Sequence, residues 1–166
     1  MERSGTEWTE RKGGWSEANW MLRGHYTVRM DEKGRIKLPA AYRRYLDGHY
    51  GSEFYVTSLT GECARLYPME EWVSIEEKLR SKGTSHAFVR KFLDRTNYYG
   101  QLAEVDAQGR ILVHPMLRSS AELLGNVAVL GYLQYLEVWE LDKFKGRIDS
   151  QPFTDDDVAS LAELGI

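Results

Sequence analysis

Short runs of apolar residues, bounded by Gly, Pro and Asp, recur along most of the chain and predict β-strands. The predicted strands are residues 26–30, 36–38, 53–58, 64–67, 102–105, 110–113, 127–131 and 135–139. Strands therefore dominate the expected secondary structure, which indicates a fold that is α+β and mainly β.

Helices are predicted where apolar residues recur at spacings of three and four. Trp72, Ile75 and Leu79 form such a stripe in an expected helix at 69–81. The next helix, for which Ser85 is the expected cap, carries a stripe formed by Phe88, Phe92 and Leu93. Shorter helices are expected at 39–46, closed by Asp47 and Gly48, at 115–124, ended by Gly125, and at 142–147, capped by Asp142; a last amphipathic stripe comprises Val158, Leu161 and Leu164.

One five-residue stretch occurs twice and organises this pattern. Residues 31–35 (Asp-Glu-Lys-Gly-Arg) return as residues 106–110 (Asp-Ala-Gln-Gly-Arg), 75 positions later, and each copy lies between two predicted strands. Each copy is followed by a proline and then a basic residue: Pro39 and Arg43 in the first, Pro115 and Arg118 in the second. A repeat of this length indicates a supersecondary unit that is used twice in one fold.

The spacing within each copy predicts a tight β-hairpin. Asp at the first position and Gly at the fourth favour a type I turn, because the carboxylate of Asp31 or Asp106 accepts backbone N–H groups across the bend. Gly34 and Gly109 can take a positive φ and form a bulge where the second strand begins. Arg35 and Arg110 then leave the turn at matching places. Two good turns, each followed by chance by a surface Arg, remain the alternative.

The predicted elements come in the same order in each half: hairpin, short helix, strand pair, helix. Neither half has enough strands to bury both faces of a sheet. We therefore expect the two halves to interlock into one pseudo-twofold closed barrel with short flanking helices, since closure removes exposed sheet edges.

Length and composition limit the remaining possibilities. The chain has 166 residues, of which 42% are hydrophobic, so one packed domain is expected. Its one cysteine, Cys63, excludes an internal disulfide and a cysteine-rich zinc site, which fits a cytoplasmic protein. No apolar run approaches the roughly 20 residues of a membrane span, so no membrane partner is expected.

Charge is distributed unevenly along the chain. The formal net charge is −3, but residues 149–166 form an acidic tail of charge −5, which leaves +2 for residues 1–148. Residues 1–20 are polar and contain Gly, and we expect a flexible N-terminal extension there. Basic clusters on the body could contact phosphate. One such cluster is on the predicted helix with Arg90, Lys91 and Arg95, where a solvated helix face is the simpler interpretation.

Enzymatic chemistry finds little support in the sequence. The four histidines, His25, His49, His86 and His114, lack metal-ligand spacing, and there is no H-E-x-x-H motif. The glycines form neither a Walker nor a dinucleotide fingerprint, and no G-x-S-x-G elbow occurs. We therefore expect no enzyme activity, metal, cofactor or small-molecule substrate. A small-molecule enzyme without a recognisable catalytic motif and a protein-interaction module remain alternatives.

Four segments together give the chain a family resemblance over about residues 21–145. They are residues 21–24 (Met-Leu-Arg-Gly), 31–39 (the first D-x-x-x-R copy through Pro39), 66–72 (Leu-Tyr-Pro-Met-Glu-Glu-Trp) and 107–112 (Ala-Gln-Gly-Arg-Ile-Leu). With these motifs the chain resembles the bacterial MraZ family. It departs from the family pattern in the extension before Met21, in His114 where a proline usually precedes Pro115, and in the loop at 131–134.

The resemblance implies both a fold and a function. The fold would be two AbrB-like (SpoVT-AbrB) swapped-hairpin repeats, at 24–72 and 101–145, joined by connecting helices at 73–98. The function would be that of a nucleoid-associated repressor, which binds repeated G-rich promoter boxes in double-stranded DNA as a homo-oligomeric ring. Its targets would be the division and cell-wall gene cluster, including its own gene. Arg35 and Arg110 would contact the DNA.

The residues around the first turn suit that role chemically. The planar fork of an Arg can pair with guanine O6 and N7 in the major groove, and a two-stranded ribbon fits that groove. Arg29, Lys33 and Lys37 flank the first turn and are expected to contact phosphates, which position a protein without specifying sequence. Gln108 stands where the first turn has Lys33, so the second turn is expected to contribute less charge.

Overall fold

The computed structural model describes residues 21–166, so the expected flexible extension at 1–20 lies outside the described residues. The fold is α+β, as predicted, with eight strands and six helices in this part of the chain. The strands are β1 (His25–Arg29), β2 (Arg35–Lys37), β3 (Glu53–Thr57), β4 (Ala64–Pro68), β5 (Gln101–Glu104), β6 (Arg110–Leu112), β7 (Asn126–Gly131) and β8 (Leu136–Glu140). All eight predicted strands are therefore confirmed, with small shifts at their ends.

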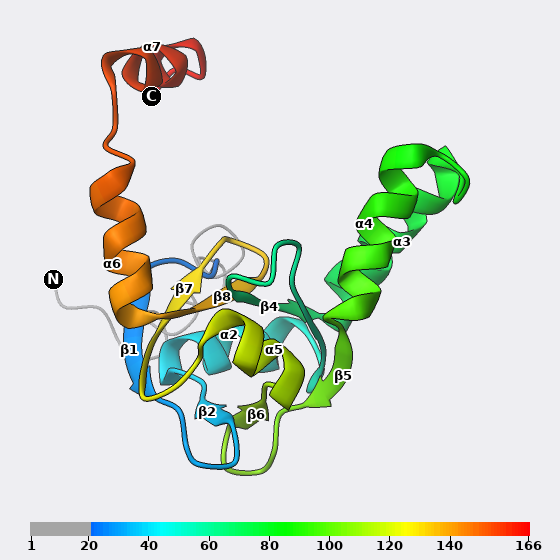
Figure 1. Cartoon of the computed structure of the whole chain (residues 1–166), viewed down its shortest axis with the longest axis vertical. Helices are drawn as coiled ribbons and strands as arrows, with labels where there is room; N and C mark the ends of the chain where they lie inside the picture. The colour runs from blue at the N-terminus through cyan, green and yellow to red at the C-terminus, as the bar shows by residue number, and fades with distance from the viewer. Residues whose placement is uncertain (1–20) are drawn as a thin grey trace, which may run out of the picture.

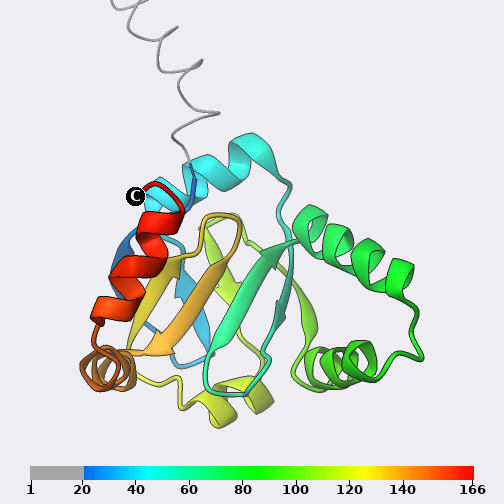
Figure 2. The ribbon, with the colours of Figure 1, turned by 90° about the horizontal axis from the view of Figure 1, so that it is seen from above.

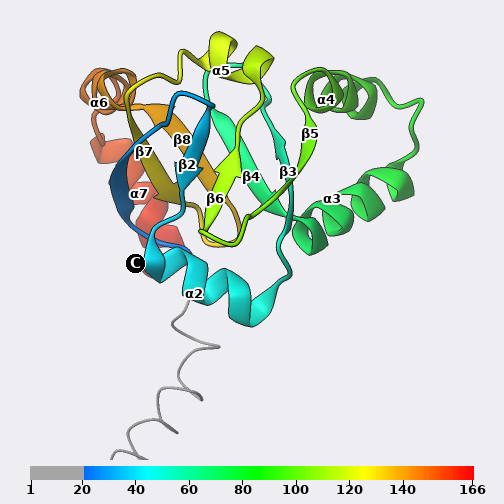
Figure 3. The same cartoon turned by 90° about the horizontal axis from the view of Figure 1, so that it is seen from below.

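The helices surround these strands. They are α2 (Ala40–His49), α3 (Met69–Lys82), α4 (Ala87–Tyr98), α5 (Pro115–Ala121), α6 (Leu141–Ser150) and α7 (Asp155–Glu163). Helices α3 and α4 form a pair that projects from one side of the sheet, while α6 and α7 lead away from the other side (Figures 1 and 2). Helices α2 and α5 lie at opposite ends of the β2–β6 pair (Figure 3).

The strands form one open six-stranded antiparallel sheet and one separate two-stranded ribbon. The sheet order is β1-β7-β8-β4-β3-β5, and the ribbon is β2-β6. Since β1 and β5 are free edges of the sheet, the expected closed barrel is not confirmed.

Strand pairing exchanges the first strands of the two halves. Strand β1 pairs with β7 of the second half, β5 pairs with β3 of the first half, and β2 pairs with β6. The sheet order therefore reads the same from either edge when the halves are interchanged. The expected ladders of β1 with β2 and of β5 with β6 are wrong for the described residues, because each strand finds its partner in the other half.

A single core joins the two halves. Ile36 and Ile111 face each other at the centre of the ribbon, and both are fully buried. They belong to one hydrophobic cluster that also contains residues of the sheet from both halves, such as Phe54 and Leu136. Because this one cluster takes residues from both halves, the apolar surface whose burial stabilises the fold is shared between them.

Several helix ends differ from the prediction. Helix α2 continues through Asp47 to His49, and α5 ends at Ala121 because Glu122 takes a left-handed conformation with φ 56°. At the start of α6, the side chain of Glu140 accepts the N–H of Lys143 at 2.8 Å, so the cap is not Asp142. Short local signals place a helix better than they place its last turn.

The helix α4 also begins and packs differently from the expectation. His86, not Ser85, is its N-cap residue, and no side chain caps it. Val89 is fully buried, whereas Phe88 of the expected stripe is 55% exposed. Tertiary packing therefore selects a face of α4 neighbouring the one that spacing alone suggested.

In the acidic tail, α7 contains Val158 and Leu161 of the predicted amphipathic stripe, whereas Leu164 is the C-cap residue just after the helix. A capping box between Thr154 and Asp157 begins this helix.

An ion pair between a half-buried arginine and a buried glutamate lies where the two halves meet in the sheet. Arg65 of β4 and Glu137 of β8 are directly opposite each other in the register, and Arg65 Nε lies 3.2 Å from Glu137 Oε2. Trp139 Nε1 donates to the other carboxylate oxygen of Glu137 at 2.9 Å. Glu137 is only 6% exposed, so Arg65 and Trp139 replace the water that would otherwise solvate its carboxylate.

The same carboxylate lies against the one cysteine. Cys63 is buried, and burial, reinforced by the negative charge of Glu137, raises the pKa of its thiol to about 12. Since the thiolate is the reactive form, we expect no reaction of the native protein with a disulfide reagent at about pH 8. One thiol per chain should react after unfolding in urea. Rapid modification of the folded protein would contradict this environment for Cys63.

Candidate nucleic-acid interface

The first copy of the repeat forms a closed turn around one aspartate. Asp31 Oδ1 accepts the backbone N–H groups of Lys33 and Arg35, both at 2.9 Å, and Gly34 N donates to Asp31 O at 3.0 Å. Gly34 has a φ of +84°, a conformation that L side chains rarely adopt. Asp31 Oδ2 also accepts Arg35 Nε at 2.9 Å, so the same carboxylate shapes the turn and orients the guanidinium.

The second copy repeats this geometry with one difference. Asp106 Oδ1 accepts the N–H groups of Gln108 and Arg110 at 2.9 Å, and Asp106 Oδ2 accepts Arg110 Nε at 3.2 Å. Gly109 has a φ of +79°. The side chain of Gln108 additionally accepts a hydrogen bond from Arg110 Nη2. No described residue makes such a contact with the Nη groups of Arg35, so the two guanidinium groups differ in how much of their fork is available.

Hydrogen bonds to both aspartates favour their charged forms. Donation from the backbone N–H of Arg35 is the largest cause that lowers the pKa of Asp31 below its ordinary 3.8, and the N–H of Arg110 acts in the same way on Asp106. The two carboxylates are therefore ionised throughout the neutral range, which keeps the turns closed.

The turns should therefore hold their shape at neutral and mildly acidic pH. A depressed pKa means that the stabilising effect is present above the unfolded-state pKa and is lost as pH falls through the lower folded value. We expect the Nε proton resonance of Arg35 to stay constant from about pH 8 to about pH 5 and to move only below 3.8. A titration midpoint above about pH 5 in this resonance would contradict the assigned hydrogen bonds.

The ribbon presents one charged face. Ile36 and Ile111 point into the core, and alternation along a strand places their neighbours on the outer face. Arg35 pairs with Leu112, and Lys37 pairs with Arg110. Three of the four outer positions are therefore cationic, and the fourth, Leu112, is 43% exposed. Sequence reasoning missed Leu112, although its place next to a buried Ile in a strand could have indicated it.

The other expected phosphate contacts lie beside this face. Lys33 is exposed in the first turn, and Arg29 is exposed at the end of β1, just before that turn. Glu32 is exposed in the same turn and offsets the charge of Lys33. The formal charges of 31–35 and 106–110 are consequently equal, so the expected difference between the turns concerns only Lys33 against Gln108 and stays a prediction.

The two turns lie on one side of the molecule, at opposite ends of the ribbon (Figures 1 and 3). Helix α4, which carries the basic residues Arg90, Lys91 and Arg95, lies elsewhere, in the helix pair at the side of the sheet (Figure 1). Among residues 21–166, no group of three His, Cys, Asp or Glu side chains is arranged to hold a metal ion. No helix in the same range is long and apolar enough to cross a membrane.

Comparison with known proteins decides the family. A sequence model of the family described as "MraZ protein, putative antitoxin-like" matches residues 21–95 and 101–158. The chain belongs to the MraZ family. Among MraZ relatives, the protein named "Transcriptional regulator MraZ" of Acidobacterium capsulatum is 47% identical over 146 residues, 88% of this chain and all of the relative. The proteins of the same name from Koribacter versatilis and Syntrophobacter fumaroxidans are 46% and 36% identical, over 88% and 76% of this chain and 100% and 84% of theirs.

One departure from the MraZ pattern noted in the sequence has a structural consequence. His114 is 7% exposed, and neither ring nitrogen has a hydrogen-bond partner among the described residues. Burial, followed by the nearby charge of Arg118, lowers the pKa of this imidazole below its usual value. His114 is therefore a neutral packing residue at pH 7.

Proposed function

We propose that this chain is a DNA-binding transcriptional regulator, which reads double-stranded DNA with the two turns that carry Arg35 and Arg110. The observation that carries the proposal is the outer face of the ribbon, where the half-buried side chains of these two residues lie beside the exposed Lys37. A two-stranded ribbon fits the major groove, and an Arg fork matches guanine. The names of the MraZ relatives support the regulatory role.

The finer features of the proposal rest on the family resemblance. They are a tandem AbrB-like architecture, repression of the division and cell-wall gene cluster including the chain's own gene, and association with the nucleoid in the cytoplasm. The exchange of first strands between the halves supports the swapped-hairpin part of this proposal. Arg29, Lys33 and Lys37 take the role of phosphate contacts, since all three are exposed around the first turn.

A homo-oligomeric ring gives the mechanism its affinity. One chain offers two turns, and few phosphate contacts mean weak binding that falls steeply with salt. Several copies that engage repeated promoter boxes convert later contacts into intramolecular ones and raise the overall affinity. Assembly and repeated boxes are therefore coupled parts of one proposal.

A binding assay with DNA from immediately upstream of the gene tests this function. Fluorescence anisotropy at about 50 to 200 mM salt should show tighter binding to this DNA than to a shuffled sequence of equal composition. Light scattering should give a mass several times the 19.2 kDa of one chain. Equal binding to both DNAs would contradict specific recognition, and a stable monomer would contradict the ring.

The variant Gln108→Lys tests how much the second turn contributes to the affinity for DNA. The change releases Arg110 Nη2 from the Gln108 contact and adds a cation at the place that Lys33 holds in the first turn. We expect tighter binding and a slope of log K against log salt that is steeper by about one per engaged turn. Lys33→Gln is the matched opposite variant and should make the slope shallower. A salt slope unchanged by both variants would place these two positions away from the phosphates.

A further inference from the structure

Each turn is covered by an arginine from the opposite half of the chain. A Cβ placed on Gly34 would lie 2.3 Å from Arg118 Cζ, so the Arg118 guanidinium rests against the Gly34 backbone. In the second turn, a Cβ on Gly109 would lie 2.5 Å from Arg43 Nη1. Both arginines stand eight positions after the turn arginine of their own half. The two contacts are therefore equivalent under the pseudo-twofold relation.

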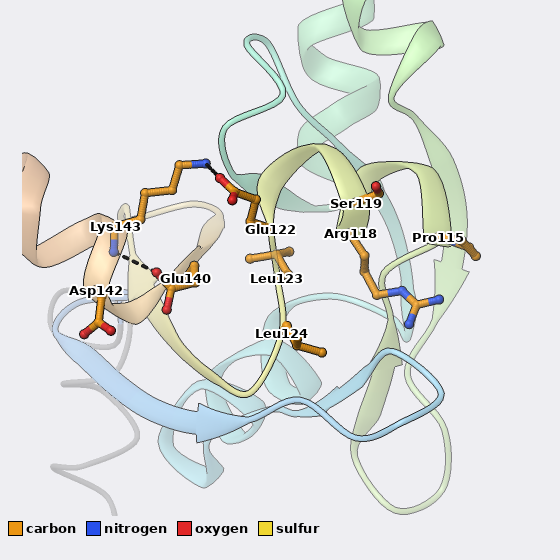
Figure 4. Close-up of a pocket in the computed structure, with 9 residues that line it drawn as sticks. All are labelled: Pro115, Arg118, Ser119, Glu122, Leu123, Leu124, Glu140, Asp142 and Lys143. Atoms are coloured by element: carbon orange, nitrogen blue, oxygen red, sulfur yellow. Dashed lines mark hydrogen bonds and ion pairs between the residues drawn. The ribbon is translucent and has the colours of Figure 1, made fainter.

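The backbone follows the same crossed pattern. Val113 N donates to Gly34 O at 3.0 Å, and Leu38 N donates to Gly109 O at 2.9 Å. Figure 4 shows the Arg118 side chain extending from α5 toward the turn between β1 and β2. Arg118 Nε is buried and has no hydrogen-bond partner among the described residues, so this guanidinium is held by packing rather than by an ion pair. Arg43 Nε lies 3.9 Å from Asp47 Oδ2, at the limit of the distance for an ion pair.

We propose that Arg118 and Arg43 are positioning residues, each of which aims the DNA-reading turn of the opposite half. Arg118 holds the turn that carries Arg35, and Arg43 holds the turn that carries Arg110. The inference rests on the proposed function for its effect on DNA, but the crossed contacts exist without DNA. Glycine at positions 34 and 109 serves both the turn conformation and the close approach of the covering arginine.

A double-mutant cycle tests the crossing with DNA from upstream of the gene. Arg118→Ala should lower the affinity about tenfold, and adding it to Arg35→Ala should weaken binding by no more than about twofold further, because both act through the first turn. Combined with Arg110→Ala, its effect should multiply. For Arg43→Ala, the effect should multiply with that of Arg35→Ala and should add no more than about twofold to that of Arg110→Ala. Multiplicative effects in both pairings would overturn the proposal.

The variant Arg118→Lys separates packing from charge. A lysine keeps the positive charge but lacks the planar guanidinium that covers Gly34. We expect Arg118→Lys to resemble Arg118→Ala. Wild-type affinity in Arg118→Lys would mean that Arg118 contacts phosphate directly, and the positioning role would be wrong.

Amide hydrogen exchange reads the same coupling without DNA. Arg118→Ala should accelerate exchange at the Lys33 and Arg35 amides, which Asp31 holds, and leave Gln108 and Arg110 unchanged. Arg43→Ala should do the reverse. Equal acceleration in both turns would indicate general destabilisation and overturn the crossed role. If the protein shows this exchange pattern but binds no DNA, the crossed positioning by Arg118 and Arg43 stands and only the proposed function fails.

Discussion

The double variant Arg35→Ala/Arg110→Ala is expected to lose specific binding to upstream DNA while it keeps its fold and its assembly size. Each good Arg–guanine pair contributes about 1–3 kcal/mol of discrimination, which corresponds to roughly 5- to 150-fold in affinity for each turn engaged. The fold should survive because Asp31 and Asp106 still accept the backbone N–H groups that close the turns. Anisotropy with specific and shuffled DNA measures the loss, and circular dichroism checks the fold.

The control for this variant is Arg80→Ala. Arg80 is an exposed arginine near the end of α3, on the helix pair that projects from the side of the sheet (Figure 1). Its removal changes net charge by one unit without touching the ribbon, so specific binding should persist. Equal losses in Arg80→Ala and in a single turn variant would mean that net charge, rather than the ribbon, governs binding.

The largest effect on stability is expected for Glu137→Ala. The substitution leaves Arg65 without its carboxylate and Trp139 Nε1 without its acceptor, at the pairing of β4 with β8 that joins the halves. Removal of one partner from a buried ion pair destabilises by about 3–5 kcal/mol, and we expect the lower end here because Arg65 is 25% exposed and still donates to Tyr67. A loss of that size is a large part of the roughly 5–15 kcal/mol that stabilises a typical domain. Urea unfolding followed by circular dichroism measures it.

An exposed ion pair provides the comparison. Lys143 Nζ lies 3.3 Å from Glu122 Oε1, and the side chain of Glu122 is 74% exposed. Pairs of this kind contribute roughly 0–1 kcal/mol, so Lys143→Met should leave the free energy of unfolding almost unchanged. Glu137→Gln can still accept a hydrogen bond from Trp139, so its loss in free energy of unfolding should lie between those of Glu137→Ala and Lys143→Met. Similar midpoints for Glu137→Ala and Lys143→Met would show that the Arg65–Glu137 pair does not stabilise the junction.

The positions of the strands and the local pairs β3–β4 and β7–β8 could be predicted from sequence, but the partners of β1, β2, β5 and β6 could not. Asp31 and Gly34 specify a bend locally, through hydrogen bonds within five residues, and that bend is present. Whether the strand after the bend folds back on the one before it depends on which apolar faces meet. Ile36 is buried against Ile111, 75 residues away, and no local signal contains that pairing.

The candidate site was likewise predictable only in part. Arg35 and Arg110 follow from the repeated spacing, and the outer face of the ribbon follows from alternation around Ile36 and Ile111. The second role of the aspartates, as acceptors from the Arg Nε atoms, depends on a side-chain geometry that spacing does not specify. The packing of Arg118 on Gly34 depends on the exchange of strands, so it could not be predicted before the topology was known.

Dimethyl sulfate protection of guanine N7 on upstream DNA tests most directly whether the two turns read the major groove. The wild-type protein should protect guanines at repeated positions, because an Arg fork that pairs with guanine covers N7. The protection should disappear in Arg35→Ala/Arg110→Ala and persist in Arg80→Ala. Tight wild-type binding without N7 protection, or an unchanged pattern in the double variant, would contradict recognition by these turns.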